Sequence, residues 1–65
     1  MALTREPNVA DSDGLYAAII DAHADLTEAE SAGLNARLVL LLANHIGDPA
    51  VLAEALSSAR TSLGK

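Results

Sequence analysis

The sequence predicts an all-α protein, with three short helices in a small helical bundle that dimerisation or a partner completes. Three observations support this class. Apolar residues recur at helical spacing in three segments, residues typical of helix ends separate these segments, and the run Leu38–Ala43 is apolar at all six positions. Because a helix turns about 100° per residue, this run points apolar groups in every direction. Neighbouring helices or another protein surface must therefore cover it.

The length and composition allow one domain with a marginal core. A chain of 65 residues buries too little surface to be strongly stable, and small scaffolds usually add disulfides, a metal or oligomerisation. There is no cysteine, and Tyr16 is the only aromatic residue, so the core must be aliphatic. By elimination, self-association or a partner protein is expected to supply the missing stability.

The formal net charge of −5 disfavours two classes of partner. Nucleic acid and anionic membranes both attract basic patches, and this chain has four Lys and Arg residues in all. Residues 1–7 lack the basic start and apolar centre of a signal peptide, and the apolar run is far shorter than the roughly 20 residues that span a bilayer. We therefore expect a cytoplasmic protein of bacterial type.

The first helix is expected over residues 12–25. Residues 1–10 show no helical period and are predicted to form an irregular leader to a single three-helix domain over 11–65. Asp11, Ser12 and Asp13 are N-cap candidates for the helix. Its apolar face would consist of Leu15, Tyr16, Ile19, Ile20, Ala22, His23 and Leu26.

The second helix is expected over residues 28–46. Thr27 and Glu30 have the spacing of a capping box, in which each side chain binds the other residue's backbone N–H. The only continuous polar stripe of this helix is narrow, and both flanks are apolar. The stripe consists of Glu30, Gly33, Arg37 and Asn44.

The third helix is expected over residues 49–62. Gly47 suits the end of the second helix because glycine adopts the left-handed conformation at low cost. Asp48 is a good N-cap, and Pro49 suits the first helical position. Since the first and third helices each have one apolar face, the second would lie between them, with a dimer burying part of it.

The two histidines are the residues that most suggest a ligand site. In a helix, His23 points away from its neighbours Asp21 and Asp25, whereas metal ligands are expected on one face. His45 lies in the last helical turn, where a positive charge would interact favourably with the helix dipole. The favoured interpretation is that both histidines pack against neighbouring side chains and bind no ligand. The alternative is a small ligand or metal site that uses His23 and His45 at a helix interface.

Two further features have alternative interpretations. Residues 43–56 have the spacing of a DNA-binding helix-turn-helix, but the would-be recognition helix offers almost no side chains that read bases or bind phosphate. Asn35 falls in the apolar arc of the second helix. It is either solvated at the edge or a buried polar group that sets the pairing register. Arg37 could pair with Glu30 or with an acidic group of a partner.

The run from Leu34 to Asp48, LNARLVLLLANHIGD, resembles the hallmark of a family of short bacterial proteins catalogued only as a domain of unknown function. The leader Pro7-Asn8 and the residues Val51, Leu52, Ala55 and Leu56 also resemble that family, so the similarity covers nearly the whole chain. The resemblance implies an accessory role, because members are often encoded beside flavin-dependent aromatic hydroxylases. It implies no catalytic residues.

These observations favour a non-enzymatic interaction protein without a cofactor. It would pair with itself, dock on a larger enzyme such as a flavin-dependent hydroxylase, or do both, through the second helix. A chain this short leaves little room for a catalytic pocket that excludes water. The expected interface residues are Asn35, Arg37, Leu38, Leu40, Leu41 and His45.

Overall fold

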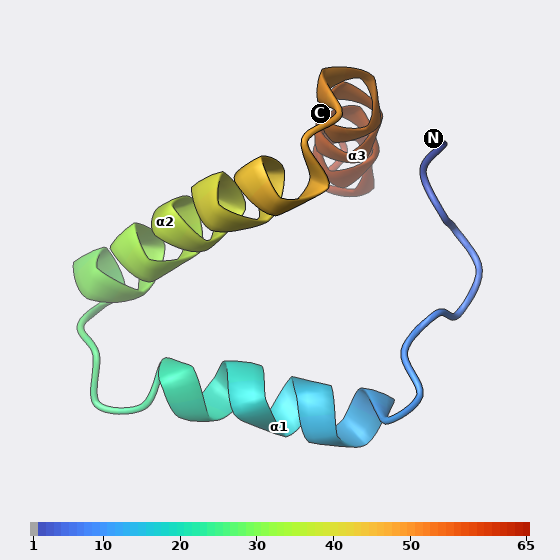
Figure 1. Ribbon diagram of the computed structural model, residues 1–65. Coiled ribbons are helices and arrows are strands. Elements are labelled where there is room, and N and C mark those ends of the chain that lie inside the picture. Colours follow the sequence, from blue (N-terminus) through green and yellow to red (C-terminus); the bar gives the residue numbers. More distant parts are fainter. Residues whose placement is uncertain (1) are drawn as a thin grey trace.

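The computed structural model describes residues 2–65, in which three α-helices form an open, all-α arrangement (Figure 1). Helix α1 spans Ser12–Ala22, α2 spans Glu28–Ile46 and α3 spans Pro49–Ser62. Within this described range there is no β-strand. The predicted fold class is therefore confirmed, and the bounds predicted for the second and third helices match α2 and α3.

Helix α1 ends three residues before the predicted bound of residue 25. The Asp11 carboxylate caps its start by accepting a hydrogen bond from the Gly14 N–H at 2.9 Å. At its end, the His23 N–H donates to the Ile20 carbonyl at 3.0 Å, which tightens the last turn. Asp25 then adopts a φ of 61°, in the left-handed region that a short polar side chain tolerates. The helix cannot continue through that conformation.

Both ends of α2 are formed by the expected local interactions. The Thr27 hydroxyl accepts from the Glu30 N–H at 3.1 Å, and the Glu30 carboxylate accepts from the Thr27 N–H at 2.9 Å. This reciprocal pair is the predicted capping box. At the other end, Gly47 has a φ of 71° and donates its N–H to the Ala43 carbonyl at 2.9 Å. The left-handed glycine ends the helix and redirects the chain.

A turn of two residues joins α2 to α3. The Asp48 carboxylate accepts hydrogen bonds from the N–H groups of Ala50 and Val51, at 3.0 and 3.4 Å. Pro49, which has no N–H to satisfy, takes the first helical position. Because this connection is short, α3 packs against the end of α2.

Helix α1 stands apart from the other two. Among the described elements, α1 packs along neither α2 nor α3, and Figure 1 shows an open space between α1 and the other two helices. The expected arrangement, with α2 covered by a helix on each side, is therefore not completed within one chain. Only α3 supplies a neighbour, at one end of α2.

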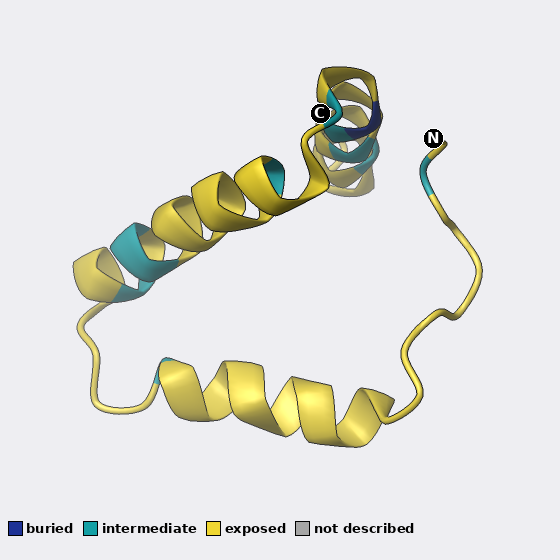
Figure 2. Cartoon of the chain, viewed as in Figure 1, coloured by how far each residue is buried: buried dark blue, intermediate teal, exposed yellow. Residues whose placement is uncertain are grey.

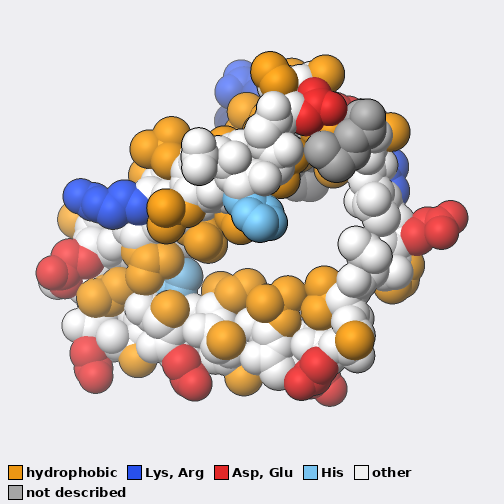
Figure 3. Space-filling model, in the orientation of Figure 1, with side chains coloured by type: hydrophobic (Ala, Val, Ile, Leu, Met, Phe, Trp, Pro, Cys, Tyr) orange, Lys and Arg blue, Asp and Glu red, His pale blue; other side chains and the backbone are white. Residues whose placement is uncertain are grey.

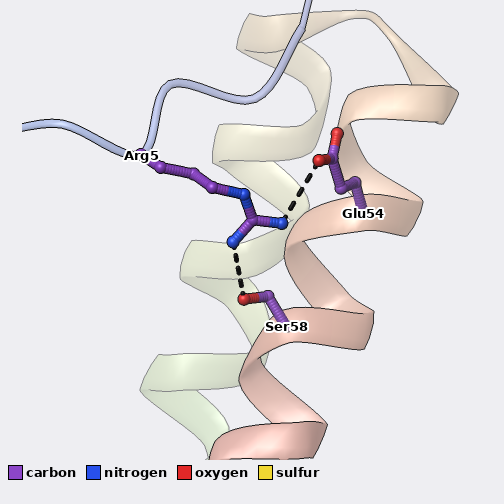
Figure 4. Close-up of polar contacts among 3 residues, drawn as sticks. All are labelled: Arg5, Glu54 and Ser58. Atoms are coloured by element: carbon purple, nitrogen blue, oxygen red, sulfur yellow. Dashed lines mark hydrogen bonds and ion pairs between the residues drawn. The ribbon is translucent and has the colours of Figure 1, made fainter.

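The leader crosses α3 and is fastened there by Arg5 (Figure 4). The Arg5 guanidinium donates to the Ser58 hydroxyl at 3.1 Å and to the Glu54 carboxylate at 3.2 Å. Val51 lies on the same face of α3, one turn before Glu54, and is 6% exposed. Both charged side chains remain about half exposed, so this ion pair contributes about 1 kcal/mol at most.

Burial is confined to this corner of the structure. Val51 is the one apolar residue of the described chain that is buried, and fourteen of the large hydrophobic residues are exposed (Figure 2). They are Val9, Leu15, Tyr16, Ile19, Ile20, Leu26, Leu38, Val39, Leu40, Leu41, Leu42, Ile46, Leu56 and Leu63. A single chain thus has well-formed helix ends and very little core.

Replacing Gly47, which ends α2, and Gly33, which lies within it, by alanine should change the free energy of unfolding in opposite directions. Gly47→Ala forces a side chain into the left-handed region and should lower the free energy of unfolding by about 1 kcal/mol. Gly33→Ala lies within the helix and should raise it by about 0.5–1 kcal/mol. The new Cβ would lie 2.8 Å from the end of the Arg37 side chain, which is flexible and can move.

Urea unfolding at one fixed protein concentration would measure both effects. Gly64→Ala is the control for Gly47→Ala, since Gly64 also has a positive φ, of 79°, but lies beyond the last helix. A Gly47→Ala variant as stable as the parent chain would contradict the assigned role of this glycine.

Candidate interaction surface

Helix α2 presents hydrophobic side chains to solvent around most of its circumference. Leu40 is 70% exposed and Leu41 is 68% exposed, although they lie on opposite sides of the polar stripe. Three further side chains of the same run are also exposed: Leu38, Val39 and Leu42. The apolar run that dominates the sequence is thus uncovered in one chain, and it forms the centre of the candidate interaction surface.

A shallow groove of about 500 Å³ lies beside the junction of α1 and α2. Most of its lining is apolar, and Glu30 and Arg37 are the charged residues that line it. The apolar residues lining this α1–α2 groove are Ala22, Leu34, Leu38 and Leu41. A groove with this lining suits an apolar helix face rather than a polar metabolite.

A second groove of similar size, about 510 Å³, lies where α2 meets α3. Its lining combines the last turns of α2 with the exposed side of α3, including Leu52 and Leu56. The two grooves open on different sides of α2, which is consistent with the two apolar flanks of that helix.

Helix α1 contributes a second apolar strip. Its exposed side chains Leu15, Tyr16, Ile19 and Ile20 share one face, as the sequence spacing predicts. Figure 3 shows hydrophobic side chains along the side of α1 that faces the open space, and acidic side chains along the opposite side. The uncovered surfaces of α1 and α2 therefore border the same space.

His23 links the end of α1 to α2. Its Nδ1 lies 2.7 Å from the Ile19 carbonyl oxygen, and its Nε2 lies 2.9 Å from the Asn35 side-chain oxygen. Both neighbours are acceptors, so only the doubly protonated imidazolium can donate to both. The bond to Ile19 first, and that to Asn35 second, raise the pKa of His23 above its ordinary value of 6.5, while desolvation opposes them.

This contact assigns a role to Asn35 that neither sequence interpretation included. Asn35 is exposed rather than buried, but it is not simply solvated, because it holds the imidazole of His23. The two residues are twelve positions apart and no local pattern relates them. A polar residue in an apolar arc was the only signal available in the sequence.

The other expected interface residues do not converge on a polar site. The Arg37 guanidinium donates to the Gly33 carbonyl of its own helix at 3.1 Å. His45 lies in the last turn of α2, as predicted. Leu38, Leu40 and Leu41 are exposed on different sides of the helix. All of these side chains are available to another chain, and they stay predictions as partner contacts.

The structure separates the two histidines proposed as ligands. His23 binds Asn35, and His45 lies ten residues further along α2, which is about 15 Å at 1.5 Å per residue. Zinc holds its nitrogen ligands at about 2 Å, so His23 and His45 of one chain cannot share an ion. Over residues 2–65, no three His, Asp or Glu side chains lie close enough together to hold a metal.

Two further features of the helices concern DNA binding and membrane spanning. Helices α2 and α3 do form a tight helix–turn–helix pair, but Arg60 is the only basic residue within α3. No described helix combines the length and apolar character required to span a membrane.

Residues 3–61 match the family described as Protein of unknown function (DUF2783). The match includes the leader from Leu3 onward, α1, α2 and all of α3 except its last residue. No curated protein and no solved structure matches the chain.

The His23–Asn35 contact should make the attachment of α1 pH-dependent. Because the folded-state pKa is raised above 6.5, the contact stabilises the fold fully below pH 6.5 and loses its effect as pH rises through the folded-state pKa. An NMR titration of the His23 ring should give a higher pKa in the native chain than in urea. In Asn35→Leu the native value should fall, but not completely, since the Ile19 carbonyl remains.

A control for other titrating groups is available in the same chain. The difference in unfolding free energy between the parent chain and His23→Gln should be largest below pH 6.5 and shrink above it, because the carboxylates are common to both. A native pKa at or below the value in urea would refute the assignment.

Proposed function

Starting from its membership of the DUF2783 family of proteins of unknown function, we propose that this chain is a non-enzymatic helical interaction protein whose fold is completed by another polypeptide. The observation that carries this proposal is the exposure of α2. Leu40 and Leu41 lie in the middle of a 19-residue helix and are each more than two-thirds exposed. Covering one leucine side chain is worth about 1.5–3 kcal/mol, so the uncovered helix favours association strongly.

The local structure supports the same proposal. All three helices have side-chain N-caps, so that N–H groups at their starts are satisfied without a partner. Caps alone do not stabilise isolated helices of 11–19 residues in water, because most helical stability in proteins comes from packing an apolar face. The helices are therefore well defined locally and depend on a surface outside the chain.

An accessory role on a larger enzyme is the finer form of this proposal. The sequence resembles a family whose members are often encoded beside flavin-dependent aromatic hydroxylases, and an oxidoreductase of that kind is the hetero-partner we propose. This rests on the resemblance alone. The ligand-binding alternative would need His23 and His45 from different chains, and DNA binding is disfavoured by the charge of −5.

The mass of the native assembly tests the proposal most directly. The tagged chain would be purified from its native source, and the intact complex weighed by native mass spectrometry. We expect a complex heavier than the 6.7 kDa chain. A monomer that is helical and unfolds cooperatively on its own would overturn the proposal.

Leu40→Asp should disrupt this association. Loss of one buried leucine weakens binding by about 10- to 100-fold, and a buried charge weakens it further. Because one chain has so little core, the helical signal in circular dichroism should fall at the same time. Ser57→Asp is the matched control, since Ser57 is exposed on the side of α3 away from both the leader and α2.

Ser57→Asp introduces the same charge within a helix, and it should leave the mass of the complex and the helical signal unchanged. If Leu40→Asp and Ser57→Asp behave alike in both measurements, Leu40 is not part of the interaction surface.

A further inference from the structure

We propose that the polypeptide covering this surface is a second copy of the same chain, packed about a two-fold axis with the facing apolar sides of α1 and α2 against the same sides of its partner. The inference rests on the proposed function and names its partner. Three observations favour a second copy: the size of the uncovered surface, the chemistry of its side chains and the placement of charge.

The uncovered area has the size that a permanent dimer buries. A compact monomer of 6.7 kDa is expected to expose about 3,900 Å², whereas this chain exposes 5546 Å². The difference is about 1,600 Å² per chain. A two-fold interface buries the same patch on both copies, which gives about 3,200 Å² in total and falls in the range of obligate dimers. A standard interface of about 800 Å² per partner would leave half of the excess exposed.

The side chains of the surface resemble a divided domain core. They are almost all Leu, Ile and Val, with Tyr16 as the one aromatic residue. Interfaces between proteins that fold separately are enriched in Tyr, Trp, Met and Arg, while those of homodimers are more apolar throughout. The aliphatic composition is therefore typical of an obligate interface, in which the two partners fold together.

Charge does not oppose pairing on these faces. Two chains of −5 repel each other unless their acidic groups stay apart. In Figure 3 the acidic side chains of α1 lie on the side away from the open space, and hydrophobic side chains border it. The α1–α2 groove itself is lined by one charged residue of each sign, Glu30 and Arg37. Pairing through the facing sides keeps the acids of α1 in solvent.

The mass and the helicity of the purified chain, measured together, test the inference. Light scattering on the eluting peak and far-ultraviolet circular dichroism would be recorded at several micromolar concentrations. We expect twice the chain mass, a helical spectrum, and an unfolding midpoint that rises with concentration. An unfolded monomer, or an assembly of more than two chains, would overturn the two-fold dimer and leave the proposed function standing. A helical monomer that unfolds cooperatively would overturn both.

Leu41→Ala tests which surface pairs without placing a charge in the helix. Alanine is the best helix former, so this change removes apolar surface while favouring helicity. Leu41 lines the α1–α2 groove, and a two-fold dimer loses this side chain from both copies, so the dimer dissociation constant should rise by at least about 100-fold. Ser57→Ala is the control and should leave it unchanged. A dissociation constant for Leu41→Ala equal to that of the parent chain would overturn the assignment of this face.

An isotope-filtered NMR experiment on mixed labelled and unlabelled chains gives an independent readout. Methyl contacts between Ile19 of one copy and Leu38 or Leu42 of the other are expected. Within one chain α1 packs along no other helix, so such contacts would arise between copies. A stable dimer with none of these contacts would overturn the proposed packing.

Discussion

The whole structure depends on one constraint, which is that α2 is apolar on both flanks and the chain supplies a neighbour at only one end of it. The two-residue turn after α2 brings α3 against that end. Arg5 of the leader binds Glu54 and Ser58 of α3, the helix that also carries the buried Val51. Helix α1, which has the right apolar face to cover the rest of α2, stands away from it. Most of the hydrophobic surface is therefore left for another molecule.

The fastening of α1 explains why it stands apart. Its only described side-chain link to α2 is the His23–Asn35 contact at the junction, and the residues after it pass through the left-handed Asp25. A link at one end fixes where the two helices meet without pressing their faces together. The resulting opening exposes both apolar strips to the same space. The polar contact at the junction therefore goes together with the exposure of the apolar faces of α1 and α2.

The candidate surface was predictable in composition but not in arrangement. The six-residue apolar run predicted that α2 has apolar flanks to cover, and the spacing predicted the apolar face of α1. The sequence patterns did not predict how the apolar faces of α1 and α2 lie relative to each other. The His23–Asn35 pair joins residues twelve positions apart, and the separation of His23 from His45 follows from the same contact. Such relations depend on the path of the chain at the junction, where Asp25 adopts the left-handed conformation.

The sequence by itself determined the all-α class, the bounds of α2 and α3, and the chemistry of both ends of α2 and of the start of α3. These features are local, since a capping box, a left-handed glycine and an Asp-Pro start each involve residues within four positions of one another. Only the tertiary structure decided that α1 ends early, that the leader is held on α3 by Arg5, and that α1 and α2 leave their apolar faces uncovered. Those outcomes depend on which distant groups meet, and helical periodicity carries no information about distant pairing.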